Sequence, residues 1–275
     1  MTTSLRGFLK GVRSGSLDHP VLFKLRQRRE AEAFADVMAG LERRPRYHVL
    51  LPSSNEVRGS VGDQAMVEAF VENVAGPIVV VQLSEDDDVV PANWADEVTA
   101  APIPGLVDGK AVRRRSVLSE YGRLLEGAIS FSVIGADVMD GAYSYRRSVQ
   151  RFTAATYAAR AGVDARILGF SWNAEPDPRA IDALREAAAA GVQIISRDPV
   201  STRRLRAAIG ERIKPAADLV FSARSVDEST RVELVPEVSE PFVVVNANGL
   251  LGAGFDQVPD YLKLIDWLVS RGRQV

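Results

Sequence analysis

The stretch Ile194-Ile-Ser-Arg-Asp-Pro-Val-Ser201, which continues to Leu205 and Gly210, predicts a strand that turns directly into a helix. Its first residues belong to a buried apolar strand, and the Arg-Asp pair marks the end of that strand. Pro199 suits the first turn of a helix, where no N–H is needed for a helical hydrogen bond. In open α/β folds such a turn lies at the carboxyl ends of the strands, where ligands bind.

Arg197 and Asp198 allow two interpretations from the sequence. Arg197 would be a fixed cation beside the partly positive start of a helix that begins near Ser201, which suits a phosphate or carboxylate ligand. Alternatively, Arg197 and Asp198 form a surface ion pair at the start of an ordinary βα unit.

Strand-like and helix-like segments alternate along most of the chain, with roughly 30 residues for each strand–helix unit. We expect strands at residues 47–51, 78–83, 128–134, 165–170, 192–196 and 217–221. We expect helices at residues 64–71, 144–161, 178–190 and 201–209. This alternation predicts an α/β fold with a doubly wound, Rossmann-like parallel sheet, which we place at residues 47–238.

Residues 1–46 carry ten Lys and Arg against five Asp and Glu, and residues 25–41 have helical spacing. We therefore expect a basic, helical N-terminal extension. It either touches an anionic membrane face, where lipid-linked substrates lie, or packs on the domain with its charges in water.

Residues 239–275 predict a linker and the first βα unit of a second domain. A strand is expected at 242–246, a helix at 258–270 and the start of another strand at 272–275. One βα unit cannot bury its own apolar faces. The segment therefore either opens a second α/β domain that continues beyond Val275 or packs back onto the first domain.

The composition excludes several classes of protein. A net charge of −2 argues against a nucleic-acid partner, and the absence of cysteine excludes disulfides, thiolate metal sites and cysteine nucleophiles. The chain shows no signal-peptide pattern and no run of about eighteen apolar residues. We expect a cytoplasmic protein without a membrane span.

Gly62 and Asp63 follow the first predicted strand, in the segment 59–63. Glycines at a helix start allow a close approach of backbone N–H groups to an anion. The segment has neither the Gly-Lys-Ser/Thr ending of a Walker loop nor the three-glycine dinucleotide motif. In the alternative interpretation, Asp63 is an acidic residue that stabilises the helix start.

Gly135 and Asp137 follow the strand at 128–134, and Ser171 and Asn173 follow the strand at 165–170. Asp137 could accept hydrogen bonds from sugar hydroxyls or act as a base, with an aromatic and cationic rim at residues 143–147. Ser171 and Asn173 suit hydroxyl-rich ligands. Each of these residues could instead be a surface or turn residue.

The acidic run 85–88 could hold a divalent cation, but such a run is more often a solvated loop. Neither His19 nor His48 has an evident partner for catalysis or metal binding. The sequence therefore predicts no metal site.

Taken together, these segments resemble the polysaccharide pyruvyl transferase family over residues 46–275. Its most specific element is Ser196-Arg-Asp-x-x-Ser201 with Leu205, followed by Asp218-Leu-Val-Phe221. The resemblance implies a two-domain fold similar to B-type glycosyltransferases. It also implies transfer of pyruvate from phosphoenolpyruvate, the donor substrate, to a sugar hydroxyl of a cell-surface or exopolysaccharide glycan, without a cofactor.

By this resemblance, Arg197 would bind the donor, and Asp63, Asp137 and Asn173 would contact an acceptor sugar, including a lipid-linked one. The family often has three glycines where this chain has Gly135-Ala-Asp137. Its general-acid histidine and further basic residues lie in the second domain, beyond Val275. These 275 residues alone are therefore expected to lack a complete active site.

Two other functions fit the same fold. One is a nucleotide-sugar glycosyltransferase that holds a metal ion on residues 86–88. The other is a non-catalytic sugar-binding or assembly module.

Overall fold

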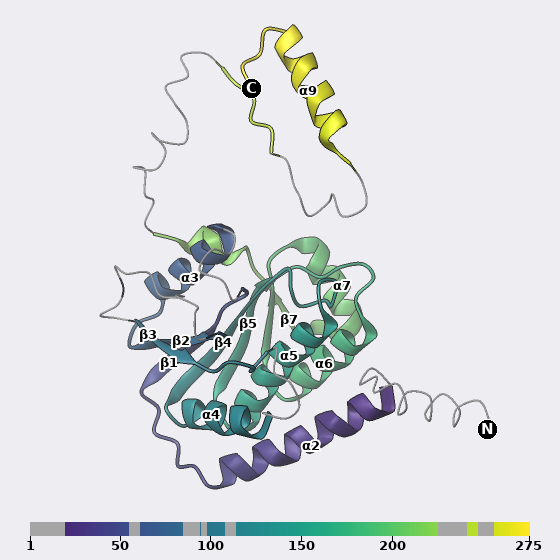
Figure 1. The fold of residues 1–275 in the computed structure, drawn as a ribbon. Helices are drawn as coiled ribbons and strands as arrows, with labels where there is room; N and C mark the ends of the chain where they lie inside the picture. The colour runs from purple at the N-terminus through teal and green to yellow at the C-terminus, as the bar shows by residue number, and fades with distance from the viewer. Residues whose placement is uncertain are drawn as a thin grey trace, which may run out of the picture. The chain divides into compact units, whose positions relative to one another are not determined.

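The structure is a computed structural model that describes residues 20–54, 61–84, 94, 98–107, 114–224, 241–246 and 256–275. The acidic run 85–88 and residues 1–19 of the basic extension lie outside this part of the chain. The chain divides into two units, Met1–Arg224 and Ser225–Val275 (Figure 1).

A seven-stranded sheet forms the centre of the first unit, and all of its neighbouring strands are parallel. Its order is β3-β2-β1-β4-β5-β6-β7. The strands are β1 (Tyr47–Leu51), β2 (Ile78–Gln82), β3 (Val98–Pro102), β4 (Ala128–Ala136), β5 (Asp164–Phe170), β6 (Gln193–Ser196) and β7 (Ile213–Pro215). This confirms the predicted α/β fold with a Rossmann-like parallel sheet.

Helices cover both faces of this sheet and bury two apolar cores. The helices of the unit are α2 (Pro20–Ala39), α3 (Val61–Asn73), α4 (Arg114–Glu126), α5 (Tyr145–Arg160), α6 (Pro178–Ala189) and α7 (Pro199–Ile209). The larger core joins the sheet to α2, α4, α5 and α6, and the smaller core joins it to α3 (Figure 1). The central strand β4 buries eight of its nine residues, as expected for a parallel strand between two helical layers.

The prediction of a strand at residues 217–221 is wrong. A 3₁₀ turn, η4 (Leu219–Ser222), occupies this place because the Asp218 side chain accepts a hydrogen bond from Val220 N. Phe221 is 85% exposed. The last strand is instead β7, whose three residues, with Pro215 at the sheet edge, are too short and too polar to form an apolar pattern.

Besides β7, one strand and one helix of the first unit were not predicted. Strand β3 has the sequence Val-Thr-Ala-Ala-Pro, which lacks the β-branched run typical of a buried strand. Helix α4 buries Val117, Leu118, Tyr121 and Leu125, a helical spacing that the sequence does contain.

Helix α2 packs on the domain. This is one of the two arrangements predicted for the basic N-terminal extension. The ring of Phe34 stacks on that of Tyr157 in α5, with centroids 4.5 Å apart and planes at 9°. It also lies 5.9 Å from the ring of Tyr121 in α4. Aromatic burial of this kind joins α2 to both helices.

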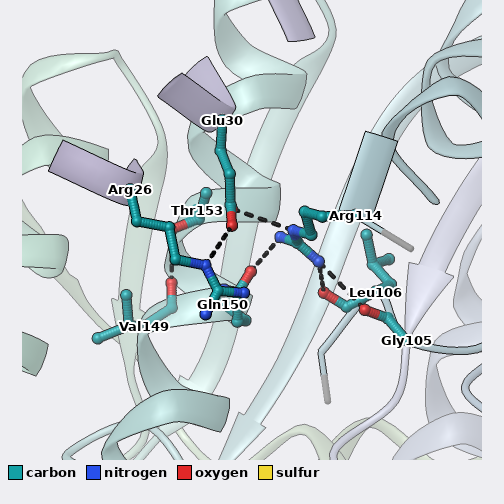
Figure 2. A network of polar contacts seen from close by, with 8 residues as sticks. All are labelled: Arg26, Glu30, Gly105, Leu106, Arg114, Val149, Gln150 and Thr153. Carbon is teal, nitrogen blue, oxygen red and sulfur yellow. Dashed lines mark hydrogen bonds and ion pairs between the residues drawn. The ribbon is translucent and has the colours of Figure 1, made fainter. Parts of the chain in front are cut away.

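A buried ionic network fixes the orientation of α2 (Figure 2). Glu30 accepts hydrogen bonds from Arg26 Nε at 3.1 Å and from Arg114 Nε at 3.0 Å. Arg114 also donates to the carbonyl oxygens of Gly105 and Leu106, and to the side-chain oxygen of Gln150. The side chains of Glu30 and Arg114 are only 10% and 7% exposed, so each charge depends on the other for its solvation.

The described part of the second unit contains α9 (Val258–Ser270) and a parallel bridge between Phe242 and Gln274. The two strands expected at its ends are thus reduced to one bridged pair. Trp267 and Leu262 of α9 are more than half exposed, at 52% and 55%. This agrees with the expectation that one βα unit cannot cover its own apolar side chains. Among the described residues, no helix is both long and apolar enough to cross a membrane.

Replacing Glu30 by alanine should destabilise the first unit by about 3–5 kcal/mol, because Arg114 would keep a buried charge without its carboxylate. Glu32 offers a matched control, since it pairs with Arg28 at 3.2 Å but is 64% exposed. Glu32→Ala should cost less than about 0.5 kcal/mol. Urea unfolding measures both values. Equal losses in the two variants would show that the network does not hold α2.

Candidate functional site

The predicted ligand-binding residues follow strands that end at one edge of the sheet. Strand order reverses between β1 and β4, because β1 continues to β2 on one side and β4 continues to β5 on the other. Open α/β sheets bind ligands at the carboxyl ends of the strands beside such a reversal. The segments after β4, β5 and β6 supply Asp137, Ser171 and Arg197 at this edge.

Gly135 and Ala136 bring the ends of β4 and β5 close together. Ser171 N donates to Ala136 O at 2.7 Å. A Cβ atom on Gly135 would lie 2.5 Å from Phe170 Cβ, so only glycine fits there without a shift. Ala136 has φ 43°, a left-handed conformation that costs a residue with a Cβ atom about 1 kcal/mol or more. Strain of this kind is common at functional sites.

Arg197 is held in place from two sides. Its Nε donates to Ser171 Oγ at 2.8 Å, and its Nη1 donates to Asp218 Oδ2 at 2.9 Å. The side chains of Arg197 and Asp218 are 23% and 25% exposed. This ion pair between Arg197 and Asp218 connects the Arg-Asp segment to the Asp-x-x-Phe segment. Asp218 follows the short strand β7 and does not begin a strand of its own. Asp198, the sequence neighbour of Arg197, makes a different set of contacts.

Asp198 caps the start of α7. Its carboxylate accepts hydrogen bonds from Ser201 N at 2.8 Å and from Ser201 Oγ at 2.6 Å. Burial by itself raises the pKa of Asp198, but the hydrogen bonds from Ser201, Val200 N and Ser171 outweigh it and leave the pKa below its ordinary value. The carboxylate of Asp198 thus lies where the helix start would otherwise attract an external anion.

Four predicted residues, Ser171, Asn173, Asp198 and Ser201, line one open depression of about 380 Å³. Asp140, Trp172, Val200 and Arg204 complete its lining.

Asp140 joins two of the segments around the depression. It is 6% exposed, and its carboxylate accepts from Ala142 N at 2.9 Å and from Asn173 N at 3.1 Å. The side chain of Asn173 is left at the surface. Asp140 therefore fixes the loop that carries Asn173.

Arg204 lines the depression as a cation that the motifs in the sequence did not single out. Its Nη1 donates to Trp172 O at 2.8 Å, and Trp172 N donates to Ser201 Oγ at 2.8 Å. Arg204 lies three residues after Ser201, a spacing that places both side chains on one face of α7. The three-residue spacing between Ser201 and Arg204 could have indicated from the sequence that Arg204 lies beside Ser201.

Asp137 lies at the surface, where its Oδ2 accepts a hydrogen bond from the hydroxyl of Tyr143 at 2.9 Å. This hydrogen bond and the negative charge of Asp137 raise the pKa of Tyr143. Tyr145, which was predicted to belong to the rim at residues 143–147, contacts α2 and Arg179 instead. Its ring contacts Phe23 of α2, with centroids 6.2 Å apart, and the guanidinium of Arg179, 3.2 Å from the ring centroid.

Gly62 and Asp63 lie in the first turn of α3, and neither lines the depression. Asp63 Oδ1 accepts a hydrogen bond from Ser53 Oγ at 2.6 Å, which connects α3 to the residues after β1. Ser53 O in turn accepts from Nη2 of the buried Arg151 in α5, also at 2.6 Å. Of the predicted residues, the structure brings Ser171, Asn173, Asp198 and Ser201 together around the depression. Gly135, Asp137 and Arg197 do not line it, although Arg197 donates to Ser171, which does, and Asp63 lies on the β1 side.

Among the described residues, no three His, Cys, Asp or Glu side chains are grouped so that they could hold a metal ion. The acidic run 85–88 lies outside this part of the chain.

Comparisons with known proteins give one distant structural similarity. No protein-family model matches the chain, and no curated protein matches it. A solved structure of the wall teichoic acid polymerase TagF (H444N, soaked with CDPG) is similar at 12% sequence identity with a TM-score of 0.37. The match covers 79% of this chain and 48% of TagF, so the chain spans about half the length of that protein. The fold assignment rests on the strand order itself.

Asp198 should make the stability of the first unit depend on pH. Its pKa is lowered on folding, so its contribution is complete above the unfolded value of about 3.9 and is lost as the pH falls through the folded value. The loss of unfolding free energy caused by Asp198→Asn should therefore be larger at pH 6 than at pH 3.

Urea unfolding at the two pH values measures this difference. In a Ser201→Ala background the pH-dependent part should shrink, because the main hydrogen-bond donor to the carboxylate is absent. An Asp198→Asn effect of the same size at both pH values would contradict the assignment.

Proposed function

We propose that this chain forms the donor- and sugar-binding part of a glycan-modifying transferase. The observation that carries the proposal is the meeting of Arg197, Ser171, Asn173 and Ser201 at the carboxyl edge of a Rossmann-like sheet. Two arginines next to hydroxyl and amide groups suit an anionic donor and a hydroxyl-rich acceptor.

Arg197 is suited to the anion because its orientation is fixed before a ligand arrives. Ser171 and Asp218 bind Nε and Nη1, and among the described residues Nη2 has no protein hydrogen-bond partner. A guanidinium held in this way can donate to a carboxylate or phosphate oxygen without losing side-chain entropy on binding. Arg204, which lines the depression itself, is the second candidate.

The specific reaction that we propose is pyruvyl transfer from phosphoenolpyruvate, which the resemblance of the sequence motifs supports. Two sugar hydroxyls form C–O bonds to C2 of the donor, and the bond from C2 to the phosphate oxygen breaks. One hydroxyl proton goes to the methylene carbon through a general acid, and the other leaves with inorganic phosphate. The acceptor would be a cell-surface or exopolysaccharide glycan.

This reaction needs more groups than the described residues bring to the depression. Asp218 neutralises part of the charge of Arg197, whereas phosphoenolpyruvate carries up to three negative charges. No histidine lines the depression in the part of the chain that the structure describes. We propose that a general acid and further cations are supplied by groups other than the described lining of the depression.

Phosphoenolpyruvate should bind the chain weakly and lose at least about tenfold in affinity on Arg197→Ala, since a hydrogen bond to a charged group contributes about 1.5–3 kcal/mol. Arg204→Ala should weaken binding by a smaller factor. Arg203→Ala is the matched control, because Arg203 is an exposed residue of α7 that neither lines the depression nor, among the described residues, donates to a residue of its lining as Arg197 does. Isothermal titration calorimetry measures all three.

Equal affinity in the Arg197→Ala and Arg203→Ala variants would remove Arg197 from the site. Binding of a nucleotide sugar with Mn²⁺ in place of phosphoenolpyruvate would favour the alternative glycosyltransferase. Melting temperatures of the three variants show whether a loss of affinity comes from unfolding.

A further inference from the structure

The outer face of α2 is basic in the first half of the helix and open to solvent. Lys24, Leu25, Arg28 and Arg29 are all exposed there. The side chains of Lys24 and Arg28 are 74% and 80% exposed, and Leu25 is 50% exposed. Leu25, Arg28 and Arg29 are three and four residues apart, so they form one stripe of the helix, and Lys24 lies beside it. We call these four residues the basic face of α2.

The packing of α2 on the domain leaves the basic face outward. The contacts that hold the helix come from other residues: Phe34 stacks on Tyr157, and Glu30 binds Arg114. Because these contacts are buried, they fix the orientation of the helix about its own axis. The two arrangements predicted for the basic extension are therefore compatible, since a helix that packs on the domain by one face still presents the other.

Surface ion pairs neutralise the basic face only weakly. Arg28 pairs with Glu32 at 3.2 Å, and Lys24 lies 3.9 Å from Asp182. All four side chains are at least 59% exposed. Exposed pairs of this kind are weak and are screened by salt, so they rearrange at little cost when a stronger anionic partner is near.

The sequence before α2 combines basic and apolar residues in a regular pattern. Four apolar residues have the i, i+3, i+4, i+7 spacing of one helical stripe, namely Leu5, Phe8, Leu9 and Val12. Three basic residues are interspersed among them: Arg6, Lys10 and Arg13. The first acidic residue is Asp18. A basic sequence with one apolar stripe is typical of segments that bind in the interface of a membrane.

The charge of the chain is divided unevenly. Residues 1–29 contain seven Lys and Arg and one Asp, a net charge of +6. The whole chain has 34 Lys and Arg and 36 Asp and Glu, so the other 246 residues have 27 against 35, a net charge of −8. An asymmetry of this size directs the basic end toward an anionic surface and the rest of the molecule away from it.

From these observations we infer that residues 5–13 and the basic face of α2 together attach the protein to a bilayer that contains anionic lipids. The apolar stripe would enter the headgroup region, and the basic side chains would bind lipid phosphates. A nucleic acid could satisfy the charges but offers no apolar layer for Leu5, Phe8 and Leu9. The inference holds whatever reaction the depression performs.

The test is sedimentation of the full chain with vesicles of phosphatidylcholine, alone or with about 30% phosphatidylglycerol. The protein should bind the anionic vesicles and not the neutral ones. Binding should weaken at least about tenfold when the salt concentration rises from about 0.1 M to about 0.5 M, because the charges are screened.

Two charge variants locate the contact. Arg6→Gln with Lys10→Gln should weaken binding to anionic vesicles about 25-fold, since each basic residue near the surface contributes roughly fivefold. Arg28→Gln with Arg29→Gln should weaken it to a similar extent. Arg203→Gln with Arg212→Gln is the matched control, because it removes two exposed charges outside the basic segment and should change binding less than about twofold.

Phe8→Ser with Leu9→Ser tests the apolar stripe at constant charge. It should weaken vesicle binding more than about tenfold and leave the melting temperature unchanged. A lowered melting temperature would show that the stripe packs on the protein itself, and it would overturn the inference. So would equal binding to neutral vesicles, equal losses in the basic-segment and control variants, or full affinity in the Phe8–Leu9 variant, which would indicate a general polyanion site.

Discussion

Burial of β4 on both faces is the constraint on which the first unit depends. Eight of its nine residues are buried, and its neighbours β1 and β5 align parallel to it. A parallel strand needs a helical layer on each face, so α3 must cover one side of the sheet and α4, α5 and α6 the other. The reversal of strand order beside β4 follows, and with it the place at the sheet edge where polar groups can gather.

At that edge the polar groups hold one another in fixed positions. Ser171 contacts Arg197, Arg197 contacts Asp218, and Asp198 binds both the backbone and the hydroxyl of Ser201. Such a network orients side chains before a ligand binds, which lowers the entropy lost on binding. It also separates the roles of the Arg-Asp pair, since Arg197 binds Ser171 and Asp218 while Asp198 stabilises the start of α7.

The layer formed by α2 has two consequences. Its buried Glu30 reaches Arg114 in α4, which fixes the helix on the domain through charges that neither residue could keep alone (Figure 2). The same helix also lines a hollow of about 820 Å³ together with α5 and α6. For the packing of α2, the basic charges that distinguish this segment in the sequence matter less than Glu30, whose carboxylate is nearly hidden from solvent.

The sequence by itself determined the α/β class, five of the seven strands and the residues that follow β4, β5 and β6, because buried parallel strands are apolar runs that end at polar turns. It could not find β3 or β7, whose short and weakly apolar sequences become strands only by pairing with β2 and β6. Only the tertiary structure decided that Arg197 pairs with Asp218, that Arg204 and Asp140 line the depression, and that Phe34 of α2 stacks on Tyr157. These facts depend on contacts between residues far apart in the chain, which no local pattern encodes.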